Sequence, residues 1–212
     1  MKSFVITIMK NAESVASAHR CIESMPNFAV SMMQAYTPEQ DPEKYAKEKG
    51  IPTEMFKNQF SRYLPCLSAF LSHHECWEYA VKFNEEVQIF EHDAVCVGSL
   101  PEVIAHKGCI SLGAPSYGKY YTPQVFGVNK LVSKQYFPGA HAYRVSPQGA
   151  KKLIEKAKTH AQPTDVFLNN KYFDFLEEYY PWPVIAKDSF STIQNKTGCL
   201  AKHNYNEGYR LI

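Results

Sequence analysis

The sequence predicts an α/β fold built on a mostly parallel β-sheet, and three observations support this class. Residues 2–9 form a β-branched apolar run typical of a buried strand, and a capped helical pattern follows at residues 11–25. A second strand pattern at residues 28–32 completes a strand–helix–strand unit, which is right-handed by default. Strand and helix patterns keep alternating further along the chain, as in α/β domains generally.

Length and composition predict one domain covering residues 1–212, and the alternation of strands and helices predicts a sheet flanked by helices. A chain of 212 residues with 45% hydrophobic and 21% charged residues can bury one substantial core. The net charge of +2 neither establishes nor excludes a nucleic-acid partner. The six cysteines lack C-x-x-C pairing, and the apolar run at residues 4–9 is too short for a signal peptide or a membrane span. We therefore expect a cytoplasmic protein.

The first half of the chain contains the clearest local signals. Asn11 is suited to cap the first helix. Residues 36–62 lose periodicity and predict a partly helical surface excursion. Pro65 suits the first turn of a second helix, which ends near residues 83–84. The strand pattern of residues 87–90 follows it directly.

The second half predicts shorter elements around one long loop. Strand patterns occur at residues 109–112 and 141–145, and the stretch between them, 114–137, is rich in Gly, Tyr and Lys and predicts a functional loop or lid. Ser146 is suited to cap a helix that has Pro147 at its first position. Residues from 163 onward predict a final aromatic-rich helical piece, and a strand follows at residues 184–186.

Two acids one residue apart, Glu91 and Asp93, follow the strand at residues 87–90. Ligands of open α/β sheets gather where strands end, so a carboxylate pair there can hold a divalent cation that carries a phosphorylated ligand. A solvated acidic turn is the alternative interpretation of the same residues.

Four motifs resemble glycosyltransferase family 25, which includes lipooligosaccharide and collagen galactosyltransferases. They occur in the order that the family shows and cover residues 66–168. In this sequence they read Cys66-x5-Ser72-His73-x3-Trp77, Phe90-Glu91-His92-Asp93-Ala94, Gly139-Ala140-His141-Ala142-Tyr143-Arg144-Val145-Ser146-x2-Gly149-Ala150, and Pro163-Thr164-Asp165. The resemblance implies a GT-A-like, Rossmann-type fold.

The chain departs from the family pattern at three places. His92 stands where the family has the second acid of Glu-Asp-Asp, and Ala69 stands where it has a cysteine. The family's opening Asn-Leu with a downstream Arg is replaced by residues 7–8 and Ser14. The change at His92 leaves open a non-catalytic binding module that keeps the fold and lacks the chemistry.

The resemblance implies a metal-dependent, inverting transfer of a hexose or pentose from a nucleotide sugar, a UDP-sugar first among the donors. Asp93 and Glu91 are the expected ligands of Mn²⁺ or Mg²⁺, and His203 is a further one, because a C-terminal His reaches the metal in many GT-A enzymes. A solvated tail residue is the alternative for His203. Donor-binding roles are expected for Ser72, His73, Glu91, His92 and Tyr143.

Asp165 occupies the family's Pro-x-Asp position and is the expected general base, since an inverting displacement needs a carboxylate near the acceptor hydroxyl. A helix N-terminal carboxylate is its alternative interpretation. The Lys- and Tyr-rich loop at residues 114–137 is suited to stack on sugars or on bases. The acceptor is therefore open between a glycan and a hydroxymethylated base in phage DNA. An unrelated nucleotide-binding protein has less support, because neither G-x-G-x-x-G nor a P-loop occurs.

Overall fold

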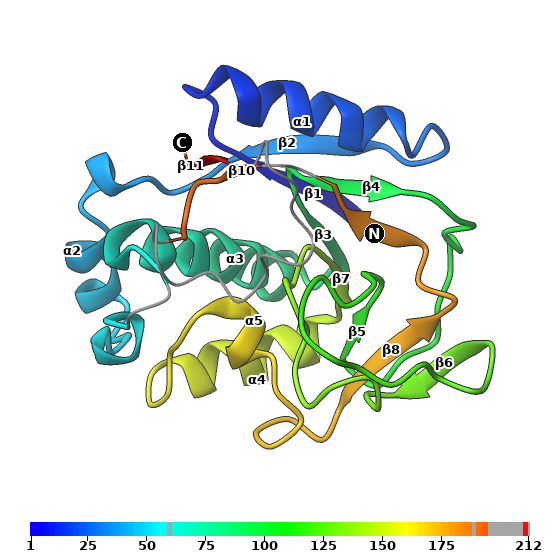
Figure 1. Cartoon of the computed structure of the whole chain (residues 1–212). Helices are drawn as coiled ribbons and strands as arrows, with labels where there is room; N and C mark the ends of the chain where they lie inside the picture. The colour runs from blue at the N-terminus through cyan, green and yellow to red at the C-terminus, as the bar shows by residue number, and fades with distance from the viewer. Residues whose placement is uncertain (59–60, 188–189, 195–209, 212) are drawn as a thin grey trace.

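A seven-stranded β-sheet is the central element of the structure, a computed structural model that describes residues 1–58, 61–187, 190–194 and 210–211 (Figure 1). The strands lie in the order β2-β1-β3-β7-β5-β8-β6. Their bounds are β1 Lys2–Thr7, β2 Val30–Gln34, β3 Val87–Glu91, β5 Cys109–Ser111, β6 Gly127–Lys130, β7 Ala142–Val145 and β8 Leu176–Tyr180.

Most strands of this sheet run in one direction. β1 is parallel to β2 and β3, and β5 is parallel to β8. β7 lies between the two groups and is antiparallel to β3 and β5, and β6 is antiparallel to β8 at the edge. The predicted α/β class with a mostly parallel sheet is therefore confirmed.

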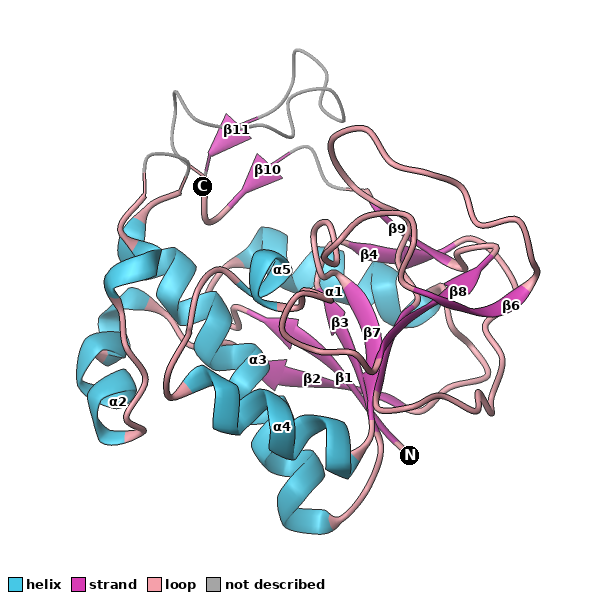
Figure 2. Cartoon of the chain, turned by 90° about the horizontal axis from the view of Figure 1, so that it is seen from below, coloured by secondary structure: helices cyan, strands magenta, loops and turns pink. Residues whose placement is uncertain are grey.

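Helices cover both faces of the sheet (Figures 1 and 2). α1 (Ala12–Glu23) lies on one face, and α3 (Tyr63–Phe83) and α4 (Pro147–Ala157) lie on the other. Side chains alternate along β1, because successive residues of a strand face opposite sides. Val5 packs into the hydrophobic cluster beneath α1, whereas Phe4 and Ile6 belong to the larger cluster shared with α3 and α4.

Local capping explains where the helices begin and end. The Asn11 side chain accepts hydrogen bonds from the backbone N–H groups of Glu13 and Ser14, and the Ser146 hydroxyl accepts one from Gly149. α3 ends at Asn84, which adopts a left-handed conformation with φ 48°. These starts and stops agree with the caps expected from the sequence.

The segment at residues 36–62 is partly helical. It contains two 3₁₀ turns, η1 (Pro38–Gln40) and η2 (Glu54–Phe56), on either side of α2 (Pro42–Glu48). Phe56 of η2 is buried against Phe70 of α3, with ring centroids 5.3 Å apart. The excursion is thus anchored on the helix that follows it.

Two strands of the central sheet occur where the sequence does not predict them. β6 lies inside the expected loop at residues 114–137, and β8 lies in the stretch expected to be helical, where the helix α5 spans only Thr164–Phe167. β8 carries Glu177 and Glu178 side by side, and both are buried. Their carboxylates accept hydrogen bonds from the backbone N–H groups of Lys107 and of residues 132–133, so distant loops satisfy them.

The C-terminal segment returns across the carboxyl edge of β3. β9 (Val184–Ala186) pairs with β4 (Ala94–Cys96), which follows β3 after a two-residue turn. Further on, β10 (Phe190–Ser191) pairs with β11 (Arg210–Leu211), and the Ile193 carbonyl accepts a hydrogen bond from the Arg62 N–H at 2.7 Å. In the described part of the chain, no helix has the length and apolar character needed to cross a membrane.

Candidate functional site

A pocket of about 740 Å³ lies at the carboxyl ends of β1 and β3. Ile6 and Ile8 line it from the end of β1, and Glu91 lines it from the end of β3. Because β7 is antiparallel, its first residues reach the same edge, and His141 lines the pocket from there. The N-terminal half of α3, the short helix α5 and residues 190–194 complete the wall. This is the location where open α/β sheets bind ligands.

The turn between β3 and β4 carries the acids that the sequence singles out. Glu91 is the last residue of β3, and His92 and Asp93 form the turn. All three line the pocket. The backbone carbonyl of Asp93 accepts a hydrogen bond from the Lys187 N–H at 3.0 Å, and the His92 ring stacks on Phe190 with centroids 5.7 Å apart. The C-terminal segment therefore holds this turn in place.

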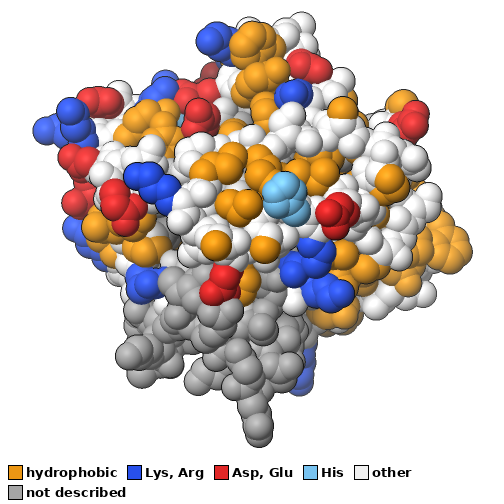
Figure 3. Space-filling view, turned by 90° about the horizontal axis from the view of Figure 1, so that it is seen from above, with side chains coloured by type: hydrophobic (Ala, Val, Ile, Leu, Met, Phe, Trp, Pro, Cys, Tyr) orange, Lys and Arg blue, Asp and Glu red, His pale blue; other side chains and the backbone are white. Residues whose placement is uncertain are grey.

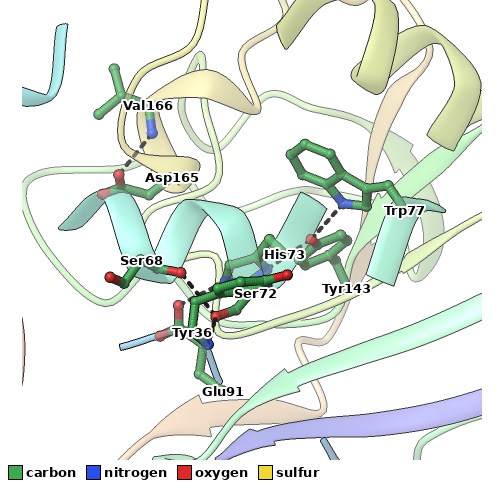
Figure 4. A network of polar contacts seen from close by, with 9 residues as sticks. All are labelled: Tyr36, Ser68, Ser72, His73, Trp77, Glu91, Tyr143, Asp165 and Val166. Carbon is green, nitrogen blue, oxygen red and sulfur yellow. Dashed lines mark hydrogen bonds and ion pairs between the residues drawn. The ribbon is translucent and has the colours of Figure 1, made fainter. Parts of the chain in front are cut away.

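A chain of buried polar contacts leads from the hydrophobic core to Glu91 (Figure 4). The Trp77 indole N–H donates to the Tyr143 hydroxyl at 2.9 Å, and that hydroxyl lies 2.9 Å from His73 Nδ1. His73 Nε2 lies 3.1 Å from Glu91 Oε1. With Glu91 ionised, Tyr143 donates to Nδ1 and Nε2–H donates to the carboxylate, so every member of the chain is satisfied.

Burial shifts the proton affinities of this network. It lowers the pKa of His73 to about 3, which keeps the imidazole neutral at pH 7. It raises the pKa of Glu91 to about 7, with nearby His92 opposing the rise and Asp165 adding to it. The side chain of Glu91 retains 27% of its exposure, on the side that faces the pocket. A neutral imidazole therefore supports a carboxyl group that exchanges its proton close to neutral pH.

Asp165 faces the same pocket from α5 and is held at both carboxylate oxygens. Tyr117 donates its hydroxyl proton to Oδ2, and the Val166 N–H donates to Oδ1 at 2.8 Å. Burial raises the pKa of Asp165, and the Tyr117 hydrogen bond opposes the rise. Asp165 also interacts electrostatically with Glu91 and His73, so the three groups share one electrostatic environment.

Ser72 lines the pocket, but its hydroxyl forms hydrogen bonds to other residues of the protein. It donates to the Ser68 carbonyl at 2.9 Å and accepts the Tyr36 N–H at 2.9 Å, which ties the segment after β2 to α3 (Figure 4). Tyr143 does not line the pocket and reaches it only through His73. His203, the expected C-terminal metal ligand, lies outside the described residues.

The lining of the pocket is acidic. Among its described residues, Arg62 is the single Lys or Arg, and the carboxylates are Glu39, Glu91, Asp93 and Asp165. A diphosphate would be repelled there unless a cation accompanied it. The described residues contain no preformed group of three metal-ligating side chains. Mg²⁺ and Mn²⁺ bound with nucleotides need only one or two carboxylates and take further ligands from phosphate and water, so the acids present fit such an ion.

Three further side chains shape the site without having been assigned a role from the sequence. Tyr117 holds Asp165 by a hydrogen bond, and Arg62 is the basic residue of the pocket lining. His141 lies between Gly113 and Gly139, and the charge of Asp93 acts on its imidazole. The space for the imidazole depends on those glycines, because a Cβ on Gly113 would meet Nε2 at 2.5 Å. Burial lowers the pKa of His141, and the charge of Asp93 and the backbone of Val184 oppose this fall. Only the glycines beside it offered a sequence signal.

No model of a known protein family matches this chain, and no curated protein matches it in sequence. The family 25 resemblance thus rests on the motifs quoted above. Among solved structures, the glycosyltransferase GlyE of Streptococcus pneumoniae TIGR4 is similar, with 10% sequence identity and a TM-score of 0.42 over 84% of this chain and 45% of that chain. The chain therefore spans less than half the length of that protein, and similarity at this level assigns it no function.

Proposed function

We propose that this protein is an inverting glycosyltransferase that moves a hexose or pentose from a nucleotide sugar, a UDP-sugar first among the candidates, to a hydroxyl acceptor. The observation that carries the proposal is the pocket at the end of β3, which Glu91, Asp93 and Asp165 all line. The family 25 motifs, which supply all three acids, support it.

The donor side of the pocket contains the acids at the end of β3. Asp93 and Glu91, with His203 as a further ligand, would hold Mn²⁺ or Mg²⁺, which supplies neutralising charge for the departing diphosphate. The Trp77–Tyr143–His73 chain holds the Glu91 carboxylate in one orientation. Arg62 lines the same pocket, and its guanidinium, which donates a hydrogen bond to the Thr192 carbonyl, adds positive charge.

The acceptor side contains Asp165. Its carboxylate takes the proton of the acceptor hydroxyl, whose oxygen then bonds to the anomeric carbon from the face opposite the diphosphate. The bond from that carbon to the phosphate oxygen breaks, and the electron pair leaves with the diphosphate, so the configuration inverts. The raised pKa of Asp165 makes it a stronger base near neutral pH than an exposed aspartate. The hydrogen bonds from Tyr117 and Val166 fix its orientation.

Turnover of a nucleotide-sugar panel in the presence of Mn²⁺ tests this function. Asp93→Asn and Asp165→Asn should each lower turnover by about 100-fold or more, because each removes a charge or proton acceptor from the reaction. Asp174→Asn is the matched control, since Asp174 is exposed outside the pocket, and it should change turnover by less than about twofold. Undiminished turnover by the wild-type protein in a metal chelator would contradict the proposal. Undiminished turnover by both pocket variants would contradict it as well.

A binding module without turnover is the second candidate. The stacking of His92 on Phe190 favours it, because the residue that replaces the family's second acid is occupied in packing. Saturable binding of a nucleotide sugar, with neither hydrolysis nor transfer across the panel, would identify this module and exclude the enzyme.

A further inference from the structure

Four aromatic rings contact one another, those of Tyr120, Phe126, Tyr180 and Trp182. The exposed Tyr121 adjoins them in the sequence, and we name these five residues the aromatic patch. Tyr121 and Phe126 are 79% and 78% exposed, and Tyr120 is 47% exposed. The Tyr120 and Tyr180 rings contact Trp182 edge to face at 5.7 and 5.2 Å, and Phe126 stacks on Tyr180 at 5.9 Å. Contiguous exposed apolar surface of this kind marks an interaction site.

A buried carboxylate holds the Trp182 ring of the aromatic patch in one orientation. The Trp182 indole N–H donates to Glu178 Oε2 at 3.1 Å. Glu178 is 1% exposed, and its other oxygen accepts the backbone N–H groups of Val132 and Ser133, both at 2.7 Å. One carboxylate of β8 thus fixes both the indole and the loop after β6. A rigid ring surface loses little conformational entropy when it binds a ligand.

Tyr117, which holds the proposed general base, lies close in the sequence to the aromatic patch. Tyr117 donates to Asp165 inside the pocket, and Lys134 Nζ lies 5.1 Å from the ring centroids of both Tyr117 and Tyr136. Tyr120 follows Tyr117 by three residues, a span of at most about 10 Å of extended chain. The Tyr121 N–H donates to the Ser133 carbonyl at 3.0 Å, which keeps this run beside the loop after β6.

The charge around these rings is small. Lys119 and Lys130 are exposed in the same segment, and Lys134 lies over the Tyr117 and Tyr136 rings. These three cations compare with the five rings of the aromatic patch. The whole chain carries a net charge of only +2, and basic and acidic side chains are interspersed on the face seen in Figure 3. Nucleic-acid affinity comes mainly from neutralising phosphates, so a DNA or RNA track needs a continuous row of cations. The apolar C–H face of a pyranose ring needs only an aromatic face to stack on.

We propose that the aromatic patch binds a carbohydrate chain, the acceptor glycan, and guides its terminal hydroxyl past Tyr117 to Asp165. This inference rests on the proposed function, which it deepens by naming the acceptor class. The sugar rings of the glycan lie on Tyr121, Phe126 and the Trp182 cluster. The phenol hydroxyls of the tyrosines hydrogen-bond to sugar hydroxyls at the edge of each ring.

The test is binding of the full chain to a printed array of neutral and acidic glycans, without nucleotide sugar or metal. We expect saturable binding to a subset of glycans, with Tyr121→Ala and Phe126→Ala each weakening it by about threefold to tenfold. Both side chains are exposed, so the variants should keep the wild-type melting temperature. Phe83→Ala is the matched control, since Phe83 is 54% exposed at the end of α3, and it should bind like the wild type.

Several outcomes would overturn the inference. These are the absence of glycan binding, binding that the two patch variants leave unchanged, tighter binding to single-stranded or hydroxymethylated DNA than to any glycan, and self-association that Phe126→Ala abolishes. The array result is separate from turnover. Glycan binding without sugar transfer would support the proposed role of the aromatic patch and contradict the proposed function. Transfer to a non-carbohydrate acceptor would support the proposed function and contradict the role of the aromatic patch.

Discussion

The hydroxyl of Tyr143 shows how one buried atom connects the core to the candidate site. It accepts from Trp77 and lies within hydrogen-bond distance of His73, and none of the three side chains exceeds 1% exposure. The sequence motif places Tyr143 among residues implied to bind the donor, yet its contacts are internal. Its contribution to the site is the orientation of His73, and through it of Glu91.

Replacing Tyr143 by Phe tests this role. The variant leaves the Trp77 N–H and His73 Nδ1 without their shared partner in a dry environment, so the free energy of unfolding should fall by about 1–3 kcal/mol. Denaturant unfolding measures the change. Tyr136→Phe is the matched control, because Tyr136 is partly exposed, and it should cost less than about 1 kcal/mol. Equal stability of wild type and Tyr143→Phe would contradict the proposed hydrogen-bond chain.

The helices and strands differ in how well the sequence predicts them. α1 and α4 were predictable because Asn11 and Ser146 cap them locally, and β3 was predictable because its apolar run ends at Glu91. β8 was not, because its buried Glu178 is satisfied by N–H groups some 45 residues away in sequence. Contacts of that separation leave no local pattern.

The approach of α4 to the sheet depends on Gly149, which belongs to one of the family 25 motifs. A Cβ at this position would lie 2.2 Å from the Gly108 carbonyl oxygen, a backbone atom that cannot move without shifting the loop before β5. Gly149→Ala should therefore destabilise the protein by about 1–3 kcal/mol, although alanine is the better helix former. Thermal unfolding against Lys151→Ala, an exposed substitution two residues further along α4, measures the effect. A stabilising Gly149→Ala would show that the helix is not held this closely.

The chain as one unit brings together acids that lie far apart in sequence. Parallel β1 and β3 place Glu91 and Asp93 at one sheet edge, and the loop after α4 returns Asp165 to the same pocket. The sequence motifs identified these acids, but their meeting depends on the order of strands and on α5, which no local pattern determines. The roles of Arg62, Tyr117 and His141 were missed for the same reason, since each enters the pocket from a different segment.

Binding of Mn²⁺ followed by electron paramagnetic resonance tests the metal site at the end of β3 most directly, because the free ion's signal disappears when it binds. In the presence of UDP, the wild-type chain should bind Mn²⁺ at least about tenfold more tightly than Asp93→Asn. The exposed-site control Asp174→Asn should match the wild type. Equal Mn²⁺ affinity of Asp93→Asn and wild type would contradict the proposed role of the strand-end acids.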